Sequence, residues 1–93
     1  MTDRVKPSPQ VVDTELGDNE VALLDLDSKT YFSLNPTGAR IWAGIKRGQE
    51  LGEIRDALQG EFQVEAERAE RGVCSLVEEL LQQELVTLES SNR

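Results

Sequence analysis

The chain of 93 residues has no histidine and one cysteine, Cys74. Without histidine it cannot assemble a Ser-His-Asp or Cys-His catalytic site, nor the usual zinc ligand sets. One cysteine also excludes a disulfide within the chain. None of the seven glycines lies in a Gly-rich loop of the kind that holds phosphate. These absences predict a protein that is not an enzyme and that holds no cofactor and no metal.

Carboxylate pairs are the remaining candidates for acid–base chemistry. Asp25 and Asp27 stand two residues apart, and Glu78 and Glu79 are adjacent on an expected helix, where they point in different directions. We interpret these residues as solvated charges at a turn or on an outer face.

Positive charge is scarce, with 10 Lys and Arg against 18 Asp and Glu and a net charge of −8. Nucleic-acid binding depends on Lys and Arg at phosphates, so no nucleic-acid partner is expected. No apolar run approaches the length of a membrane span, and the first residues, MTDRVKPSPQ, lack the apolar core of a signal peptide. We therefore expect a cytoplasmic protein without a membrane partner.

The length suits one small domain with a modest core. We expect a flexible N-terminal arm over residues 1–9, because this segment is polar and rich in proline. A single domain over residues 10–88 and a frayed tail over residues 89–93 complete the expected organisation.

Three segments in the first third predict strands. In residues 11–16 one face, Val12, Thr14 and Leu16, is less polar than the other, which is a weak strand pattern. Residues 21–26 are more uniformly apolar, and residues 30–34 contain adjacent aromatics. Turn-forming residues lie between them at 17–19 and 27–29. The pattern predicts a three-stranded antiparallel meander with the second strand in the middle.

The apolar period changes to 3.6 after the third strand. Asn35 suits the N-cap of a first helix, Pro36 suits its first position, and Gly48 follows its end. A second helix begins near Leu51 and is expected to be interrupted near Gly60. The third and longest helix has its N-cap near Glu65 and runs from residue 66 to about residue 84. Strands followed by three helices predict an α+β, winged-helix-like fold.

Several single residues can be assigned to a face. Phe32 and Leu34 are expected in the core, with Tyr31 and Ser33 on the opposite face of the strand. Trp42 shares the core face of the first helix with Ile41 and Ile45.

Gly72 lies in the middle of the third helix, where glycine costs roughly 1 kcal/mol relative to alanine. It is either an exposed, tolerated glycine or the place where something lies alongside the helix. Cys74 is expected to be a partly buried small residue.

The run YFSLNPTGARIW at residues 31–42, with LGEIRDALQGEFQVE at 51–65 and VEELLQQELV at 77–86, resembles the PqqD-like family of RiPP recognition elements. The resemblance covers about residues 10–88. It implies a cytoplasmic, non-catalytic domain whose partners are the leader of a ribosomally made precursor peptide and a leader protease or other modifying enzyme. In such domains the leader pairs as an added strand beside the third strand, next to the third helix.

Carried onto this chain, the resemblance implies a peptide-binding site on the third strand and the third helix. Its expected residues are Lys29, Thr30, Tyr31, Phe32, Ser33, Leu34, Arg68, Arg71, Gly72, Val73, Leu76 and Leu80. For Arg68 and Arg71, ion pairs on the helix surface with Glu67 or Glu78 are the rival explanation to pairing with an acidic leader.

The chain departs from the family pattern at three places. Gln49 and Glu50 stand where a Ser or Thr cap is usual, Gly72 where an acidic residue is usual, and Glu84 where a glycine is usual. The segment LLDLDSKTYFSLN is more similar to stand-alone recognition proteins of lasso-peptide pathways. The alternatives are a peptide chaperone of pyrroloquinoline quinone biosynthesis, a structural or regulatory interaction subunit and a winged-helix DNA binder.

Overall fold

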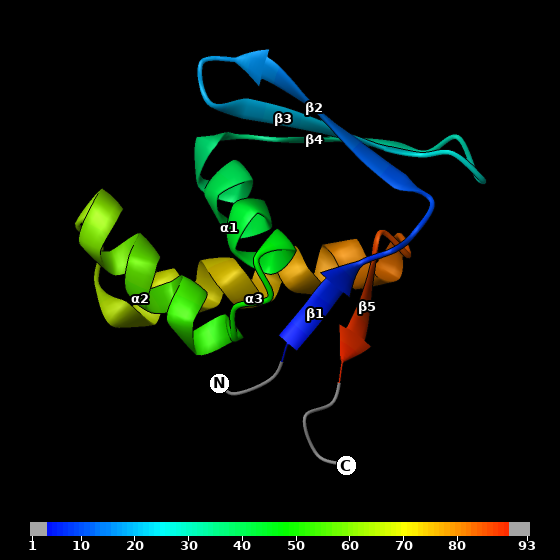
Figure 1. Ribbon diagram of the computed structural model, residues 1–93. Coiled ribbons are helices and arrows are strands. Elements are labelled where there is room, and N and C mark those ends of the chain that lie inside the picture. Colours follow the sequence, from blue (N-terminus) through cyan, green and yellow to red (C-terminus); the bar gives the residue numbers. More distant parts are fainter. Residues whose placement is uncertain (1–3, 90–93) are drawn as a thin grey trace.

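The computed structural model describes residues 4–89, which form an α+β fold of one main sheet and three helices (Figure 1). The three strands of the main sheet are antiparallel and follow one another in the order β2 (Val11–Gly17), β3 (Glu20–Asp25) and β4 (Tyr31–Leu34). The helices that follow are α1 (Pro36–Lys46), α2 (Leu51–Phe62) and α3 (Ala66–Gln82). The predicted winged-helix-like arrangement, with the second predicted strand in the middle, is confirmed.

A second, two-stranded sheet was not predicted. It pairs β1 (Arg4–Pro7) with β5 (Val86–Glu89) in antiparallel register. The expectation of a flexible N-terminal arm is therefore wrong for residues 4–7, because Val5 is buried in the core and β1 is paired along its length. The next residue, Ser8, is also held: its N–H donates to the carbonyl of Leu85 at 3.0 Å. Residues 1–3 of the expected arm and 90–93 of the expected tail lie outside the described residues.

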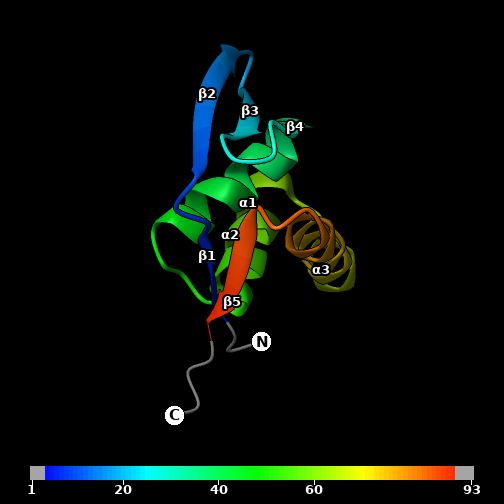
Figure 2. The same ribbon diagram turned by 90° about the vertical axis from the view of Figure 1, so that its right-hand side faces the viewer.

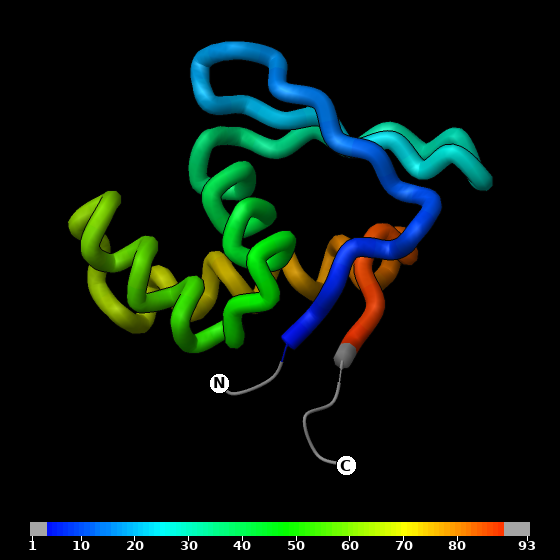
Figure 3. Tube along the Cα trace, in the orientation of Figure 1, coloured from blue at the N-terminus to red at the C-terminus, as the bar shows by residue number. Residues whose placement is uncertain are grey.

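The two faces of the main sheet differ as the alternation predicts. Phe32 packs against the core and Leu34 is buried within it, whereas Tyr31 and Ser33 are exposed. The hairpin of β2 and β3 extends over α1 and away from the β1–β5 sheet (Figure 3). The helices therefore cover one face of the sheet, and its other face is open to solvent at Tyr31.

Helix α1 follows the predicted capping chemistry. The Asn35 side chain accepts a hydrogen bond from the Gly38 N–H at 2.8 Å, and Pro36 takes the first helical position. At the other end Gly48 has φ +77°, the left-handed conformation that glycine adopts without strain. The cap holds α1 at a fixed angle directly after β4.

Helix α2 is continuous, so the predicted interruption near Gly60 is wrong. A Cβ at Gly60 would meet nothing within 4 Å, and Leu58 beside it is buried, so packing of the helix outweighs the weak helix preference of one exposed glycine. The absent Ser or Thr cap is replaced by a capping box, in which the Glu50 N–H donates to the Glu53 carboxylate at 2.8 Å.

Helix α3 begins after Glu65, as predicted, and ends at Gln82. Glu84 has φ +60°, which explains why a glycine is the usual residue there. After this change of direction Leu85 and Val86 are buried, and the chain continues into β5.

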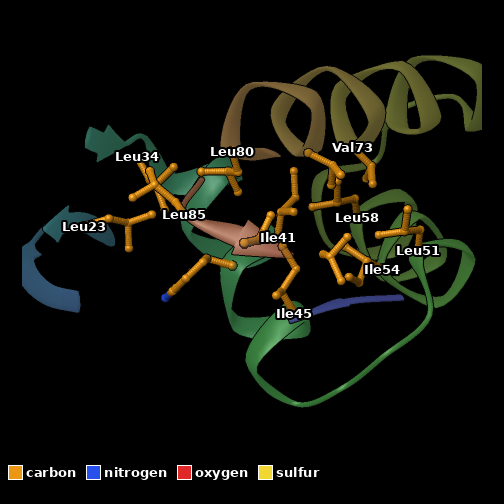
Figure 4. Close-up of a cluster of buried hydrophobic side chains, with 14 of the residues drawn as sticks. Leu23, Leu34, Ile41, Ile45, Leu51, Ile54, Leu58, Val73, Leu80 and Leu85 are labelled. Atoms are coloured by element: carbon orange, nitrogen blue, oxygen red, sulfur yellow. The ribbon is translucent and has the colours of Figure 1, made fainter. Parts of the chain in front are cut away.

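The core joins the main sheet, the three helices and the β1–β5 sheet. Figure 4 shows side chains from these elements pointing toward one another, among them Leu23, Leu34, Ile41, Ile54, Val73 and Leu80. Trp42 belongs to this cluster, as predicted. Within residues 4–89 no helix is long and apolar enough to cross a membrane.

Candidate functional site

Strand β4 is an edge strand, because its sole partner among the described strands is β3. The hairpin begins with the Asp25 N–H donating to the Thr30 carbonyl at 2.9 Å. Antiparallel pairing alternates between hydrogen-bonded and non-hydrogen-bonded pairs, so the backbone groups of Phe32 and Leu34 point toward β3. The N–H and C=O groups of Tyr31 and Ser33 therefore point to the open edge.

The open edge of β4 lies on the same side of the molecule as α3. Figure 2 shows the main sheet nearly end on, with β4 toward α3 and β2 at the opposite side. Both outer strands are edges of the sheet, but a chain added at β4 would run beside α3. The β4 edge is therefore the one where a bound segment would meet a second wall.

The turn before β4 is organised by Asp25, which is 3% exposed. Its carboxylate accepts hydrogen bonds from the N–H groups of Asp27 and Ser28, at 2.9 and 3.2 Å, and from the Gln10 side chain. Desolvation raises the pKa of Asp25, but the hydrogen bonds from Ser28, Gln10 and Asp27 outweigh it and leave that pKa below its usual value. The interpretation of Asp25 as a solvated charge is wrong: it is a buried structural acceptor that shapes the turn.

The first residues of the predicted site belong to this turn. Lys29 has φ +64° and is exposed, and its N–H donates to the Asp25 carbonyl at 2.7 Å. Thr30 is half-buried, and its hydroxyl lies 2.7 Å from that of Ser28. The turn thereby holds the start of β4 in place.

The α3 residues of the predicted site separate into two groups. Val73 and Leu80 are fully buried in the core, so their side chains are not open to a ligand. Gly72, Arg68 and Arg71 are exposed and Leu76 is half-buried. The buried residues pack α3 against the core, and the exposed and half-buried residues are accessible to a ligand.

The two arginines also differ in their surroundings. Arg71 forms an ion pair with Glu67 at 3.3 Å, the rival explanation considered from the sequence. Arg68 has no ion-pair or hydrogen-bond partner within residues 4–89. Arg68 is therefore the cation on this face that is available to an acidic group.

A hollow of about 250 Å³ lies beside Gly72 and Arg68. Its other lining residues come from the start of α1, the end of α2, the connection between α2 and α3, and the beginning of α3, namely Thr37, Leu58, Phe62, Val64 and Ala69. A Cβ at Gly72 would meet nothing within 4 Å, so the glycine keeps this side of the helix open. Thr37 and Val64 were not predicted as lining residues, because no periodicity links the start of one helix to the connection between two others.

The expectation for Cys74 can be compared with the structure. Cys74 is exposed, not partly buried, because it lies between the buried positions of α3. Across residues 4–89 no group of three or more His, Cys, Asp or Glu side chains is placed to hold a metal ion.

Comparisons with known proteins agree with this geometry. A family model described as "Coenzyme PQQ synthesis protein D (PqqD)" matches residues 20–86. A solved structure described as "TbiB1 in Complex with the TbiA(beta) Leader Peptide" is 37% identical, with a TM-score of 0.82 over 87% of this chain and 93% of that chain. A second, "Lasso peptide synthetase B1 complexed with the leader peptide", is 28% identical, with a TM-score of 0.81 over 89% of this chain and 96% of that one.

A comparison with curated proteins gave no match. The family model nevertheless spans the chain from the central strand β3 through the three helices to the start of β5. Since this is well over half of the sequence and includes the cap, the helices and the edge strand, the chain belongs to the PqqD family.

Proposed function

We propose that this protein is a non-catalytic recognition element that binds the leader of a ribosomally synthesised precursor peptide as an added strand at the β4 edge. The observation that carries the proposal is the likeness to a structure that is 37% identical, has a TM-score of 0.82 and is described as a complex with a leader peptide. An open edge strand beside a helix supplies the geometry that strand addition requires.

Backbone pairing at this edge is expected to supply only part of the affinity. Tyr31 and Ser33 each offer an N–H and a C=O, and each net hydrogen bond contributes about 1 kcal/mol. Two or three apolar anchors at roughly 1.5–3 kcal/mol each would then offset an association cost of several kcal/mol. Micromolar or tighter binding follows, with specificity supplied by the anchors.

The anchor positions follow from exposure. Leu76 is half-buried and can be covered further by an apolar leader side chain, and the hollow at Gly72 has room for another. Arg68 would pair with an acidic leader residue. Val73 and Leu80 support this wall from the core and make no direct contact.

We assign the leader to a lasso-peptide type of pathway, because both relatives at 28–37% identity are described as leader complexes and one as a lasso peptide synthetase B1. The protein would present the leader to a leader protease or another modifying enzyme in the cytoplasm, where precursors are made. The description of the family model favours a second candidate, a peptide chaperone of pyrroloquinoline quinone biosynthesis.

The test is calorimetric titration with a synthetic leader from a precursor gene beside this one, against a scrambled leader of the same composition. Only the native order should bind. Hydrogen exchange measured in the same complex should slow at the amides of Tyr31 and Ser33, which point to the open edge. Binding without slower exchange at these amides would refute strand addition at β4, and no binding by any nearby precursor would refute the function.

A further inference from the structure

A second and larger hollow, of about 620 Å³, lies beneath the β2–β3 hairpin. The hairpin forms one wall, and α1 with the end of α2 forms the other. We call it the hairpin groove. Its strand wall comes from β2, the turn after it and the start of β3. In the sheet, β4 lies on the side of α3 and β2 on the opposite side (Figure 2). A ligand in the hairpin groove therefore leaves the β4 edge free, and the two hollows share one lining residue, Phe62.

The floor of the hairpin groove is largely apolar. It is formed by Pro36, Ala39, Trp42, Ala43 and Phe62, and Phe62 is 40% exposed. Phe62 provides apolar surface that a partner's side chains can cover, and the indole of the sole tryptophan, Trp42, is 3% exposed and lines the same groove.

The basic residues of the hairpin groove are already paired with acids. Lys46 lies 2.7 Å from Asp13, and Arg40 lies 3.0 Å from Glu61. Arg40 Nη1 has no hydrogen-bond partner among residues 4–89, but it is shielded from solvent and so is not presented to a ligand. Lys46 and Arg40 thus each have an acidic partner within the chain.

The hairpin wall carries an excess of negative charge. Glu15, Asp18 and Glu20 line the groove and are exposed, and their carboxylates have no ion-pair or hydrogen-bond partner within the described part of the chain. They are held together by the tight turn, in which Asp18 and Asn19 have φ +52° and +63°. Three unpaired carboxylates therefore face an apolar floor across one groove.

We infer that the hairpin groove is a docking site for a basic, amphipathic segment of a partner protein. Its Lys or Arg side chains would face Glu15, Asp18 and Glu20, and its apolar side chains would cover the exposed residues of the floor, Pro36 and Phe62. A nucleic acid is excluded by the sign of the charge, and a second copy is disfavoured because each chain carries −8. The inference goes beyond leader binding and stands without it.

Trp42 reports on this site, because it is the sole tryptophan and lines the groove. The probe is a short synthetic peptide in which lysine and leucine alternate, and its control replaces every lysine with glutamate. We expect the lysine peptide to change Trp42 emission saturably, and the glutamate peptide to leave it unchanged. A lysine peptide that binds by calorimetry without any change in Trp42 emission would overturn the inference.

Two matched triple variants separate the groove from overall charge. The first, Glu15→Gln, Asp18→Asn and Glu20→Gln, neutralises the hairpin wall. The second, Asp27→Asn, Glu78→Gln and Glu79→Gln, removes the same charge from exposed residues outside the groove. We expect the first to weaken the lysine peptide about tenfold and the second less than about twofold. Equal weakening in both would overturn the inference.

Two further measurements distinguish the other outcomes. Leader titrated into the complex with the lysine peptide should still bind, because the β4 edge is free and Phe62 is the one residue that lines both hollows. Displacement of the lysine peptide would refute separate sites. If the leader does not bind but the first triple variant still weakens binding of the lysine peptide, the proposed leader function is refuted and this inference is supported. Self-association seen by sedimentation and lost in the first triple variant would assign the groove to a second copy and overturn it.

Discussion

The indole Nε1 of Trp42 donates a hydrogen bond to Asp13 Oδ2 at 2.7 Å, which ties helix α1 to strand β2. The same carboxylate oxygen accepts a second bond from Lys46 Nζ, also at 2.7 Å. The hydrogen bond from Lys46, followed by that from Trp42, holds the pKa of Asp13 below its usual value of 3.8. A half-buried carboxylate thus sets how the hairpin lies over α1.

This contact predicts a pH-dependent loss of stability in Asp13→Asn. At pH 7 the free energy of unfolding of the variant should be about 1–2 kcal/mol lower than that of the native protein, because the variant loses a charge-assisted acceptor for Trp42 and Lys46. The folded-state pKa of Asp13 lies below 3.8, so the stabilisation is complete above about pH 5 and is lost as the pH falls through the folded-state pKa. Urea unfolding at several pH values should show the difference between variant and native protein shrinking in acid. A stability difference that is independent of pH would contradict this role of the Asp13 carboxylate. Asp27→Asn, at an exposed aspartate, is the control variant.

The open edge of β4 predicts the effect of proline at Ser33. The Ser33 N–H points away from β3, so Ser33→Pro removes no bond of the sheet but removes a donor to an added strand and places a ring at the edge. We expect a folded protein whose leader affinity falls at least about tenfold, equivalent to about 1.4 kcal/mol. Calorimetric titration with the leader measures the loss.

Two controls accompany this variant. Ser33→Ala keeps the N–H and should bind as the native protein does. Glu15→Pro places proline on β2, the opposite edge of the sheet, and should also leave leader affinity unchanged. Native affinity in Ser33→Pro would show that this N–H takes no part in binding.

Two helical glycines predict opposite effects of alanine. A Cβ at Gly44 would lie 2.7 Å from Ile54 Cγ1 and 2.8 Å from Gln49 Oε1, so α1 and α2 would have to move apart. We expect Gly44→Ala to destabilise the protein by about 1–3 kcal/mol. Gly72→Ala meets open space and should stabilise it by about 0.5–1 kcal/mol. Thermal unfolding of both variants tests the pair, and a Gly44→Ala protein as stable as the native one would contradict this packing.

The hollow beside Gly72 predicts a separation of stability from binding. Gly72→Leu should leave the fold intact, because the position is exposed, yet it should fill the hollow and weaken the leader. Gly60→Leu is the matched control, since Gly60 is also an exposed helical glycine but does not line the hollow. Titration of both variants with the leader should show loss only at Gly72. Equal affinity in two well-folded variants would rule out a steric role.

Local chemistry in the sequence was sufficient to predict the three helices, the meander and the faces of β4. Asn35 and Pro36 act within one turn of α1, and alternation at residues 31–34 separates the core side from the solvent side. The helix break predicted at Gly60 does not occur. One glycine destabilises a helix by about 1 kcal/mol, which is less than the stabilisation contributed by the burial of Leu58 beside it. Propensity was outweighed there by packing.

Only the tertiary structure decided which surfaces are available. The pairing of β1 with β5 joins residues at the two ends of the described chain, and no local pattern encodes such a contact. The burial of Val73 and Leu80, the hollow at Gly72 and the acidic wall of the hairpin groove also depend on residues that are far apart in the sequence. They could therefore not be predicted from local patterns. The sequence by itself determined an edge-forming strand held by a capped helix. The packing of α3 and the hairpin around that strand decided where a partner can approach, because exposure depends on what lies opposite in space.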